Sequence, residues 1–171
     1  MLPASPHGAV QIRPLGRSDR ERLADAYARL GEETRRRRFR SAATRLSARD
    51  LDALTGIDHR GHEALAAVAP DGDIVGVARY VRLPHAPGAA EVAVAVADAW
   101  QGRGVARRLL EELAGRARAE GVARFIAYVG ADNPIVRRWI ARLGGVAVAH
   151  HDDEIVYAVP LDGRAERRAA A

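Results

Sequence analysis

The spacing of hydrophobic residues divides the chain into strand-like and helix-like stretches. Apolar side chains at every second position are typical of strands, and apolar side chains three or four residues apart are typical of helices. Alternating or continuously apolar stretches predict strands at residues 9–15, 63–69, 73–82, 91–97, 122–129, 146–151 and 154–160. Helical spacing predicts helices at residues 19–30, 35–40, 48–55, 104–120 and 134–143.

Capping and turn signals mark the ends of several of these elements. Ser18 and Ser47 each precede an acidic residue by three positions, which predicts a capping box at the start of two helices. The Pro-Asp-Gly sequence at 70–72 separates two apolar stretches and predicts a hairpin. Gly76, inside the second strand of that hairpin, indicates a bulge or a close approach of other groups to the backbone.

The order of the elements predicts the fold class. Strand 91–97, helix 104–120 and strand 122–129 form a β-α-β unit, so we expect these two strands to be parallel, with a right-handed crossover. Hairpins before and after this unit add antiparallel strands. We therefore expect an α/β (α+β) fold with a mixed, mostly antiparallel sheet of about seven strands flanked by helices. We expect a single domain over residues 1–161 and a frayed tail over 162–171.

The composition is typical of a globular protein. The 171 residues are 48% hydrophobic and 29% charged, and no apolar run is long enough to span a membrane. The N-terminus lacks the apolar region of a signal peptide, so we predict a cytoplasmic protein without membrane contact. The absence of cysteine excludes disulfides, thiolate metal sites and a cysteine nucleophile.

All 27 basic residues are arginines, and the net charge is +5. This charge permits anionic partners such as phosphates, nucleic acids or acidic protein surfaces. We do not expect nucleic acid as a partner because only 5% of the residues are aromatic and could stack on bases. The arginine run at 35–40 is either a solvated helix face or a contact for an acidic surface.

A glycine-bearing turn joins the strand at 91–97 to the helix at 104–120. It reads QGRGVA from Gln101 to Ala106 and fits the pattern Q-x-x-G-x-A. Glycines let the backbone approach a ligand closely, and the free amides at a helix start favour anions. Arg103, Arg107 and Arg108 lie where the helix dipole disfavours cations, and a bound polyanion would reverse that effect. The alternative is that they are surface residues of an arginine-rich protein.

A dinucleotide-binding turn is the main competing interpretation of this glycine pattern. That motif needs a third glycine where this chain has Arg107, and its parallel strands begin early in the chain rather than after several antiparallel ones. We therefore favour another kind of phosphate-binding loop.

This turn, together with the element order over residues 9–160, resembles the GNAT N-acetyltransferase superfamily. The resemblance implies an acetyl-CoA-binding enzyme with the pyrophosphate of the coenzyme on the turn and pantetheine between two splayed parallel strands. The residues that it assigns to coenzyme binding are Val94, Ala95, Val96, Gln101, Gly102, Arg103, Gly104, Val105, Ala106, Arg107 and Asn133. Asn133 is also a plain candidate for a helix N-cap. Many members have a tyrosine general acid seven residues after this asparagine, where this chain has Ile140.

The stretches ETRRRRFRSAATRLSARDL, DIVGVARYVR and AEVAVAVADAWQGRGVARRLL are similar to bacterial Pat-type protein lysine acetyltransferase domains. That similarity implies that Glu91 is the general base and that the acceptor is a protein lysine. A lysine amine has a pKa near 10.4, so a base must take its proton before attack. We expect apolar neighbours to desolvate Glu91 and strengthen it as a base.

Two other functions stay open. One is acetylation of a small-molecule amine, and the other is a non-catalytic CoA-binding regulatory module, which the isoleucine at 140 favours. The histidines have no spacing typical of metal ligands, and we predict no metal site.

Overall fold

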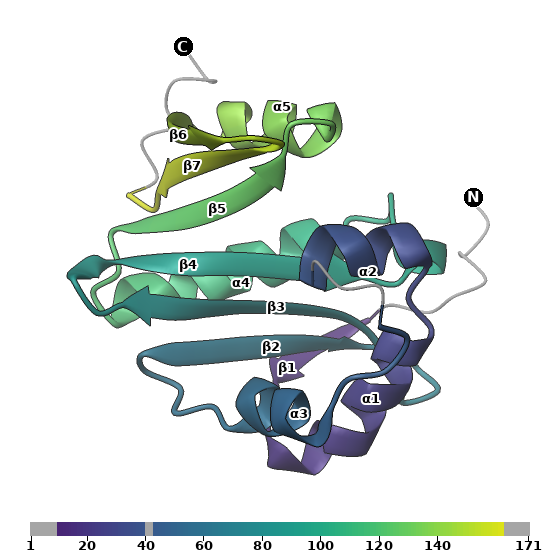
Figure 1. Cartoon of the computed structure of the whole chain (residues 1–171). Helices are drawn as coiled ribbons and strands as arrows, with labels where there is room; N and C mark the ends of the chain where they lie inside the picture. The colour runs from purple at the N-terminus through teal and green to yellow at the C-terminus, as the bar shows by residue number, and fades with distance from the viewer. Residues whose placement is uncertain (1–9, 40–42, 163–171) are drawn as a thin grey trace, which may run out of the picture. The chain divides into compact units, whose positions relative to one another are not determined.

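Seven strands form one mixed sheet in the computed structural model, which describes residues 10–39 and 43–162. The strand order across the sheet is β1-β2-β3-β4-β5-β7-β6. Only β4 and β5 are parallel among the pairs β1–β2, β4–β5, β5–β7 and β6–β7. The strands are β1 (Gln11–Pro14), β2 (His62–Val68), β3 (Ile74–Leu83), β4 (Ala86–Val96), β5 (Arg124–Gly130), β6 (Val146–His151) and β7 (Glu154–Pro160). The predicted fold class and parallel pair are confirmed (Figure 1).

Five α-helices and two short 3-10 turns connect these strands in the described part of the chain. The α-helices are α1 (Arg20–Ala28), α2 (Glu32–Phe39), α3 (Ala48–Thr55), α4 (Val105–Ala119) and α5 (Pro134–Arg142). The 3-10 turns are η1 (Arg17–Asp19) and η2 (Asp98–Trp100).

The chain divides into two compact units, and β3, β4 and α4 each contribute residues to both. The first unit comprises Met1–Arg79 and Val94–Leu113, and the second comprises Tyr80–Ala93 and Ala114–Ala171. The coenzyme turn lies wholly in the first unit. The prediction of a single domain over 1–161 stays a prediction, and residues 163–171 of the tail lie outside the described residues.

The core of the first unit is a cluster of apolar side chains from α1, α3 and the first strands. Its buried members are Leu15, Leu23, Leu51, Ala64, Ala66 and Ile74. Small alanines on β2 let the two helices pack close to the strands, as Figure 1 shows for α1 and α3.

Helix α4 packs close to β3 at Gly76. A Cβ atom at this position would lie 3.1 Å from Leu109 and 3.2 Å from Val105 of α4, and 3.4 Å from Val96. These contacts are tight, so a side chain at Gly76 would force the neighbouring side chains of α4 to shift. The predicted close approach at this glycine is confirmed.

The second unit is built around β5. This strand pairs along its whole length with β7, from Arg124 opposite Pro160 to Gly130 opposite Glu154. On its other side it pairs with β4 over three residues, ending where Glu91 lies opposite Ile126.

Several of the predicted boundaries are wrong. Helix α2 begins at Glu32, three residues before its expected start at Arg35, and its expected last residue, Arg40, lies outside the described residues. Ser18 lies inside the 3-10 turn η1, and α1 begins only at Arg20, because the Asp19 carboxylate accepts a hydrogen bond from the N–H of Gly16 and closes a separate turn there. The stretch before Glu91, expected as a loop, is part of β4, which begins at Ala86. The capping box of Ser47 and Asp50 on α3 is confirmed, with an Asp50 N–H to Ser47 Oγ distance of 3.1 Å.

Candidate functional site

The turn at 101–104 and the start of α4 form an open, exposed surface in the first unit. Gly102 and Gly104 have φ angles of 72° and 77°, a backbone conformation that favours glycine. A Cβ atom at either glycine would meet nothing within 4 Å, so space remains beside this backbone. The first N–H groups of a helix have no intrahelical partner. In α4, the N–H of Arg108 donates to the carbonyl oxygen of Gly104 at 3.1 Å. The turn therefore presents donors to an anion.

Gln101 joins this turn to the end of β4. Its Nε2 donates to the carbonyl oxygen of Val96 at 3.1 Å and lies 3.3 Å from Oδ1 of Asp98. The side chain therefore orders the turn rather than pointing freely to solvent. The sequence indicated a role for Gln101 but not for Asp98, which lies three residues earlier. A single aspartate is common on protein surfaces and gives no signal by itself.

The three arginines near the helix start have different surroundings. Arg103 lies over the ring of Trp100, with its Cζ 5.4 Å from the ring centroid. Arg107 forms an exposed ion pair with Glu111, at 3.1 Å. Arg108 donates to the carbonyl oxygen of Val10 at 3.2 Å, so this guanidinium has a structural partner. Only Arg103 and Arg107 therefore fit the expectation of cations available to a polyanion.

Residues 94–96 form the end of β4. Val94 and Ala95 are half-buried and Val96 is buried, with its side chain beside Gly76 of β3. The N–H of the next residue, Ala97, donates to Val75 O of β3 at 2.8 Å. The stretch assigned to pantetheine is thus held in an extended conformation by its neighbour β3.

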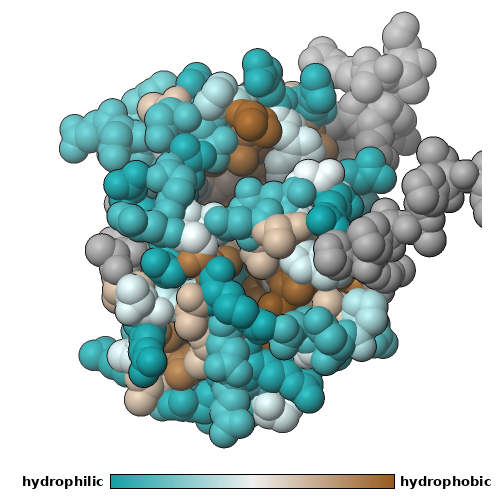
Figure 2. All heavy atoms as spheres, turned by 90° about the vertical axis from the view of Figure 1, so that its right-hand side faces the viewer, coloured by the Kyte–Doolittle hydropathy of each residue, from teal (hydrophilic) through white to brown (hydrophobic). Residues whose placement is uncertain are grey.

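An apolar cavity of about 50 Å³ lies beside the end of β4 in the first unit. Its walls come mainly from α1 and β3, and they include Tyr27, Leu30, Val77, Ala95 and Ala97. The hydroxyl of Tyr27 donates to Ala43 O at 3.1 Å, so its polar group is satisfied. Figure 2, which views the molecule from the right-hand side of Figure 1, shows a mostly hydrophilic face with apolar atoms at the bottom of hollows.

Glu91 lies in the middle of β4 in the second unit, at the last pair of the parallel β4–β5 register. Its prediction as a residue at the start of the strand was wrong because β4 begins five residues earlier. Glu91 is exposed, so the desolvation expected from its apolar neighbours is not present in this structure. The residue is accessible from solvent.

Asn133 caps helix α5 in the second unit. Its Oδ1 accepts a hydrogen bond from the N–H of Val136 at 3.3 Å, which is the simpler of its two predicted roles. Ile140, seven residues later, is only 4% exposed and belongs to the core. The position at which the family resemblance led us to look for a tyrosine is therefore filled by a packing residue.

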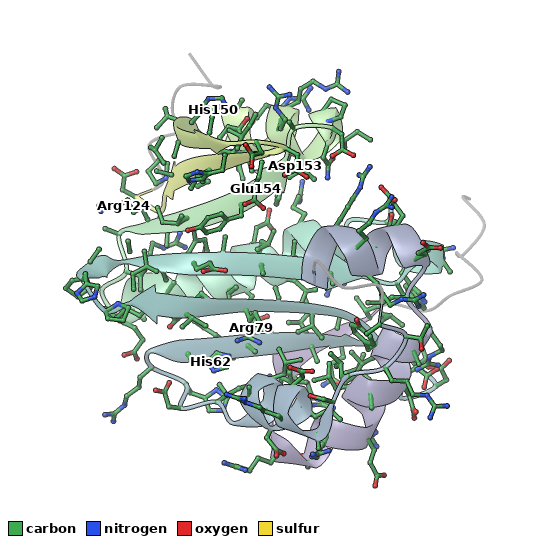
Figure 3. The ribbon with its side chains drawn as sticks, viewed as in Figure 1. His62, Arg79, Arg124, His150, Asp153 and Glu154 are labelled. Atoms are coloured by element: carbon green, nitrogen blue, oxygen red, sulfur yellow. The ribbon has the colours of Figure 1, made fainter. Side chains whose placement is uncertain are left out.

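His59 lies just before β2, and His62 is the first residue of that strand. Nδ1 of His59 lies 2.8 Å from Oε1 of Glu63, which is only 3% exposed. Burial, aided by the positive charge of Arg79, lowers the pKa of His62, and Figure 3 shows these two side chains on β2 and β3. Among residues 10–39 and 43–162, no three His, Cys, Asp or Glu side chains are placed to hold a metal ion.

The helices of the described residues include none with the length and apolar character to cross a membrane. The longest, α4, has 15 residues, four of them arginines.

Comparisons with known proteins agree with this geometry. The model of the Acetyltransferase (GNAT) family matches residues 25–145. Over 138 residues the chain is 36% identical to Acetyltransferase Pat of Mycolicibacterium smegmatis. This match covers 80% of this chain and 41% of that protein. Over 147 residues it is 35% identical to Acetyltransferase PA5475 of Pseudomonas aeruginosa, covering 84% of this chain and 78% of that protein.

The chain thus spans less than half of the M. smegmatis protein and about four fifths of the P. aeruginosa one. Among solved structures, the GNAT domain of S. lividans PAT has a TM-score of 0.82 and 33% identity, covering 90% of this chain and 91% of that domain. The chain belongs to the acetyltransferase (GNAT) family.

Proposed function

We propose that this protein transfers an acetyl group from acetyl-CoA to the amine of a protein lysine. The observation that carries the proposal is the turn at 101–104, where two glycines with positive φ leave open space beside the free amides of α4. An acetyl-CoA pyrophosphate fits such a surface because it is a compact anion that accepts several N–H bonds at once. A solved structure of the same fold, yncA from Salmonella typhimurium, contains acetyl-CoA, at 20% identity and a TM-score of 0.74.

Several residues would hold the coenzyme in this proposal. The turn residues Gln101, Gly102, Arg103, Gly104, Val105, Ala106 and Arg107 would hold the phosphates, and Asn133 would contact the coenzyme from the start of α5. The backbone of Val94, Ala95 and Val96 would hydrogen-bond the pantetheine arm. An amide of the same strand would also polarise the thioester carbonyl, in the manner of an oxyanion hole.

Glu91 would act as the general base. At neutral pH a lysine amine is protonated and cannot attack, so the carboxylate must accept its proton directly or through a water molecule. The amine nitrogen would then bond to the acetyl carbon, and the carbon–sulfur bond would break. CoA would leave as a thiolate, which takes up the proton that the nitrogen loses as the amide forms. The exposure of Glu91 supports this role for a large acceptor because a surface lysine could reach it.

The acceptor class rests on the similarity to Pat-type proteins and on the arginine-rich helix α2. Two of its arginines, Arg36 and Arg37, pair with Glu33 at 2.6 Å each, so part of the positive charge is already balanced within the helix. A small-molecule amine is therefore retained as the second acceptor class. A CoA-binding regulatory module is the remaining alternative because Ile140 replaces a tyrosine.

The first test is substitution of Glu91 by Gln, which keeps the shape of the side chain and removes its basicity. We expect turnover to fall by roughly 10²–10⁴-fold, while calorimetry shows acetyl-CoA affinity within about twofold of the wild type. Glu21→Gln, an exposed carboxylate on α1, is the matched control and should keep wild-type turnover. Wild-type turnover in Glu91→Gln would refute the base assignment.

A second measurement separates the acceptor classes. Wild-type protein would be incubated with acetyl-CoA and either lysine-containing proteins and peptides or a panel of small amines, and CoA release would be followed. Transfer to proteins alone supports the proposal, and transfer to small amines alone supports the second acceptor class. Acetyl-CoA binding without any transfer would support the regulatory module instead.

A further inference from the structure

A side-chain network ties the coenzyme turn to the arginine-rich helix α2 within the first unit. Thr34, in the first turn of α2, donates from Oγ1 to Oδ1 of Asp98 at 2.8 Å. Nε2 of Gln101 lies 3.3 Å from the same carboxylate oxygen and 3.4 Å from Oγ1 of Thr34. A residue of α2, a residue of η2 and the first residue of the turn therefore share one cluster of hydrogen bonds.

The other oxygen of Asp98 lies against the start of α2. A Cβ atom at Gly31 would overlap Oδ2 of Asp98, so a side chain there would force the carboxylate to move. Gly31 also accepts the hydrogen bond from the N–H of Arg35, at 3.0 Å, which closes the first turn of the helix. The carboxylate therefore lies at the N-terminal end of α2, where a helix dipole favours negative charge.

This arrangement bears on the repulsion between Asp98 and a phosphate bound at the turn. Asp98 is an anion three residues before a turn that would bind phosphates, and an unpaired carboxylate there would repel them. Its Oδ1 instead accepts from Thr34 and Gln101, and its Oδ2 lies beside Gly31 at the start of α2. The same bonds fix the side chain of Gln101, which also reaches Val96 O on β4.

We propose that Asp98 is a positioning residue that couples acetyl-CoA binding at the turn to the ordering of helix α2. The inference rests on the proposed function because it needs acetyl-CoA to bind this turn. When the coenzyme immobilises the turn, the shared bonds from Asp98 and Gln101 to Thr34 also restrain the first turn of α2. Linkage is reciprocal, so whatever orders α2, including an acceptor bound to its arginines, tightens coenzyme binding.

The primary test is amide hydrogen exchange of the whole protein with and without acetyl-CoA. In the wild type, saturating acetyl-CoA should slow exchange in the peptide that covers Glu32–Phe39 by at least threefold, as well as in the peptide that covers the turn. In Asp98→Ala and Thr34→Val the turn should still be protected, whereas the protection of α2 should be lost. Thr34→Ser, which keeps the hydroxyl, should restore it.

Coenzyme affinity provides the second readout. Loss of one or two of these hydrogen bonds should raise the dissociation constant of acetyl-CoA by about threefold to tenfold in Thr34→Val and Asp98→Ala. Glu32→Gln, an exposed substitution on the same helix turn, should leave both readouts unchanged. Turnover at saturating acetyl-CoA should change less than the Michaelis constant for acetyl-CoA, because the network touches no reacting atom.

A third arm needs no ligand. In the free protein, Thr34→Val should speed exchange in the turn peptide relative to Thr34→Ser. Unchanged exchange there, or acetyl-CoA binding that protects the turn but leaves α2 unaffected in the wild type, would refute the coupling and leave the proposed function intact. Failure of the wild type to bind acetyl-CoA would refute the proposed function, and the inference with it.

Discussion

Asp19 is the most buried charged residue described, with 2% of its surface exposed. Its carboxylate oxygens accept from Nη1 and Nη2 of Arg13, at 2.8 Å and 2.7 Å, and from the N–H of Gly16 at 3.1 Å. These bonds from Arg13 outweigh the effect of burial and lower the pKa of Asp19. Its contribution to stability is present above the ordinary aspartate pKa and is lost as the pH falls below it.

The half-buried His62 predicts a separate loss of stability at mildly acidic pH. Burial lowers the pKa of His62, and the nearby Arg79 adds to this effect. The unfolded chain then takes up a proton near pH 6.5 while the folded protein resists it. Stability is therefore fully present above about pH 6.5 and falls as the pH drops through that value, well above the range in which Asp19 titrates.

Urea unfolding of the wild type and of His62→Gln, each at pH 8.0 and pH 5.5, measures this effect. The wild type should lose more free energy of unfolding between the two pH values than the variant, which lacks the titrating group. Equal losses would show that the imidazole of His62 is protonated as easily in the folded protein as in the unfolded chain.

At the scale of single elements, α5 depends on its cap. Asn133 supplies the side-chain oxygen that accepts the N–H of Val136, and Pro134 occupies the first helical position, where a missing N–H costs nothing. Replacing a cap of this kind by alanine destabilises a helix by roughly 1 kcal/mol.

Two substitutions at Asn133 separate its cap role from its proposed contact with the coenzyme. Asn133→Ala should lower the free energy of unfolding by about 1 kcal/mol, whereas Asn133→Asp keeps an oxygen acceptor and should lower it by less. If the amide also contacts acetyl-CoA, Asn133→Asp should weaken coenzyme binding at least threefold, as measured by calorimetry. Wild-type affinity in Asn133→Asp would leave Asn133 as a cap alone.

At the scale of the whole molecule, the coenzyme should stabilise the folded chain. A ligand that binds only the folded state adds about 2.7 kcal/mol at a concentration 100 times its dissociation constant. For a chain of this length that corresponds to a rise in melting temperature of about 5–10 °C. Thermal unfolding by circular dichroism, with and without acetyl-CoA, measures it, with inorganic phosphate at the same concentration as the control. An unchanged melting temperature would contradict acetyl-CoA binding.

Much of the fold could be predicted because its signals are local. The capping box at Ser47, the hairpin at 70–72 and the β-α-β unit around α4 each depend on residues close together in the chain. The end of η1 could not be predicted in this way. Ser18 looked like a cap, but Arg13 holds Asp19 in a separate turn, and that pairing exists only after β1 has formed.

In the candidate site, too, some features could be predicted from the sequence and others could not. The glycines at 102 and 104 are readable because a positive φ restricts the residue type, and the amides beside them follow from the start of a helix. The contacts of the charged residues cannot be predicted from the sequence. They depend on distant parts of the chain, as in the hydrogen bond from Arg108 to the carbonyl oxygen of Val10 and the bond from Thr34 to Asp98. The exposure of Glu91 depends on distant residues in the same way.

The sequence by itself determined the order of the elements, the parallel strand pair and the open turn at the start of α4. These follow from hydrophobic periodicity and backbone sterics, which act over a few residues. Only the tertiary structure decided which polar groups meet. It joined Thr34 of α2 to Asp98 and Gln101, more than sixty residues away, because packing of the first unit brings the start of α2 beside the end of β4.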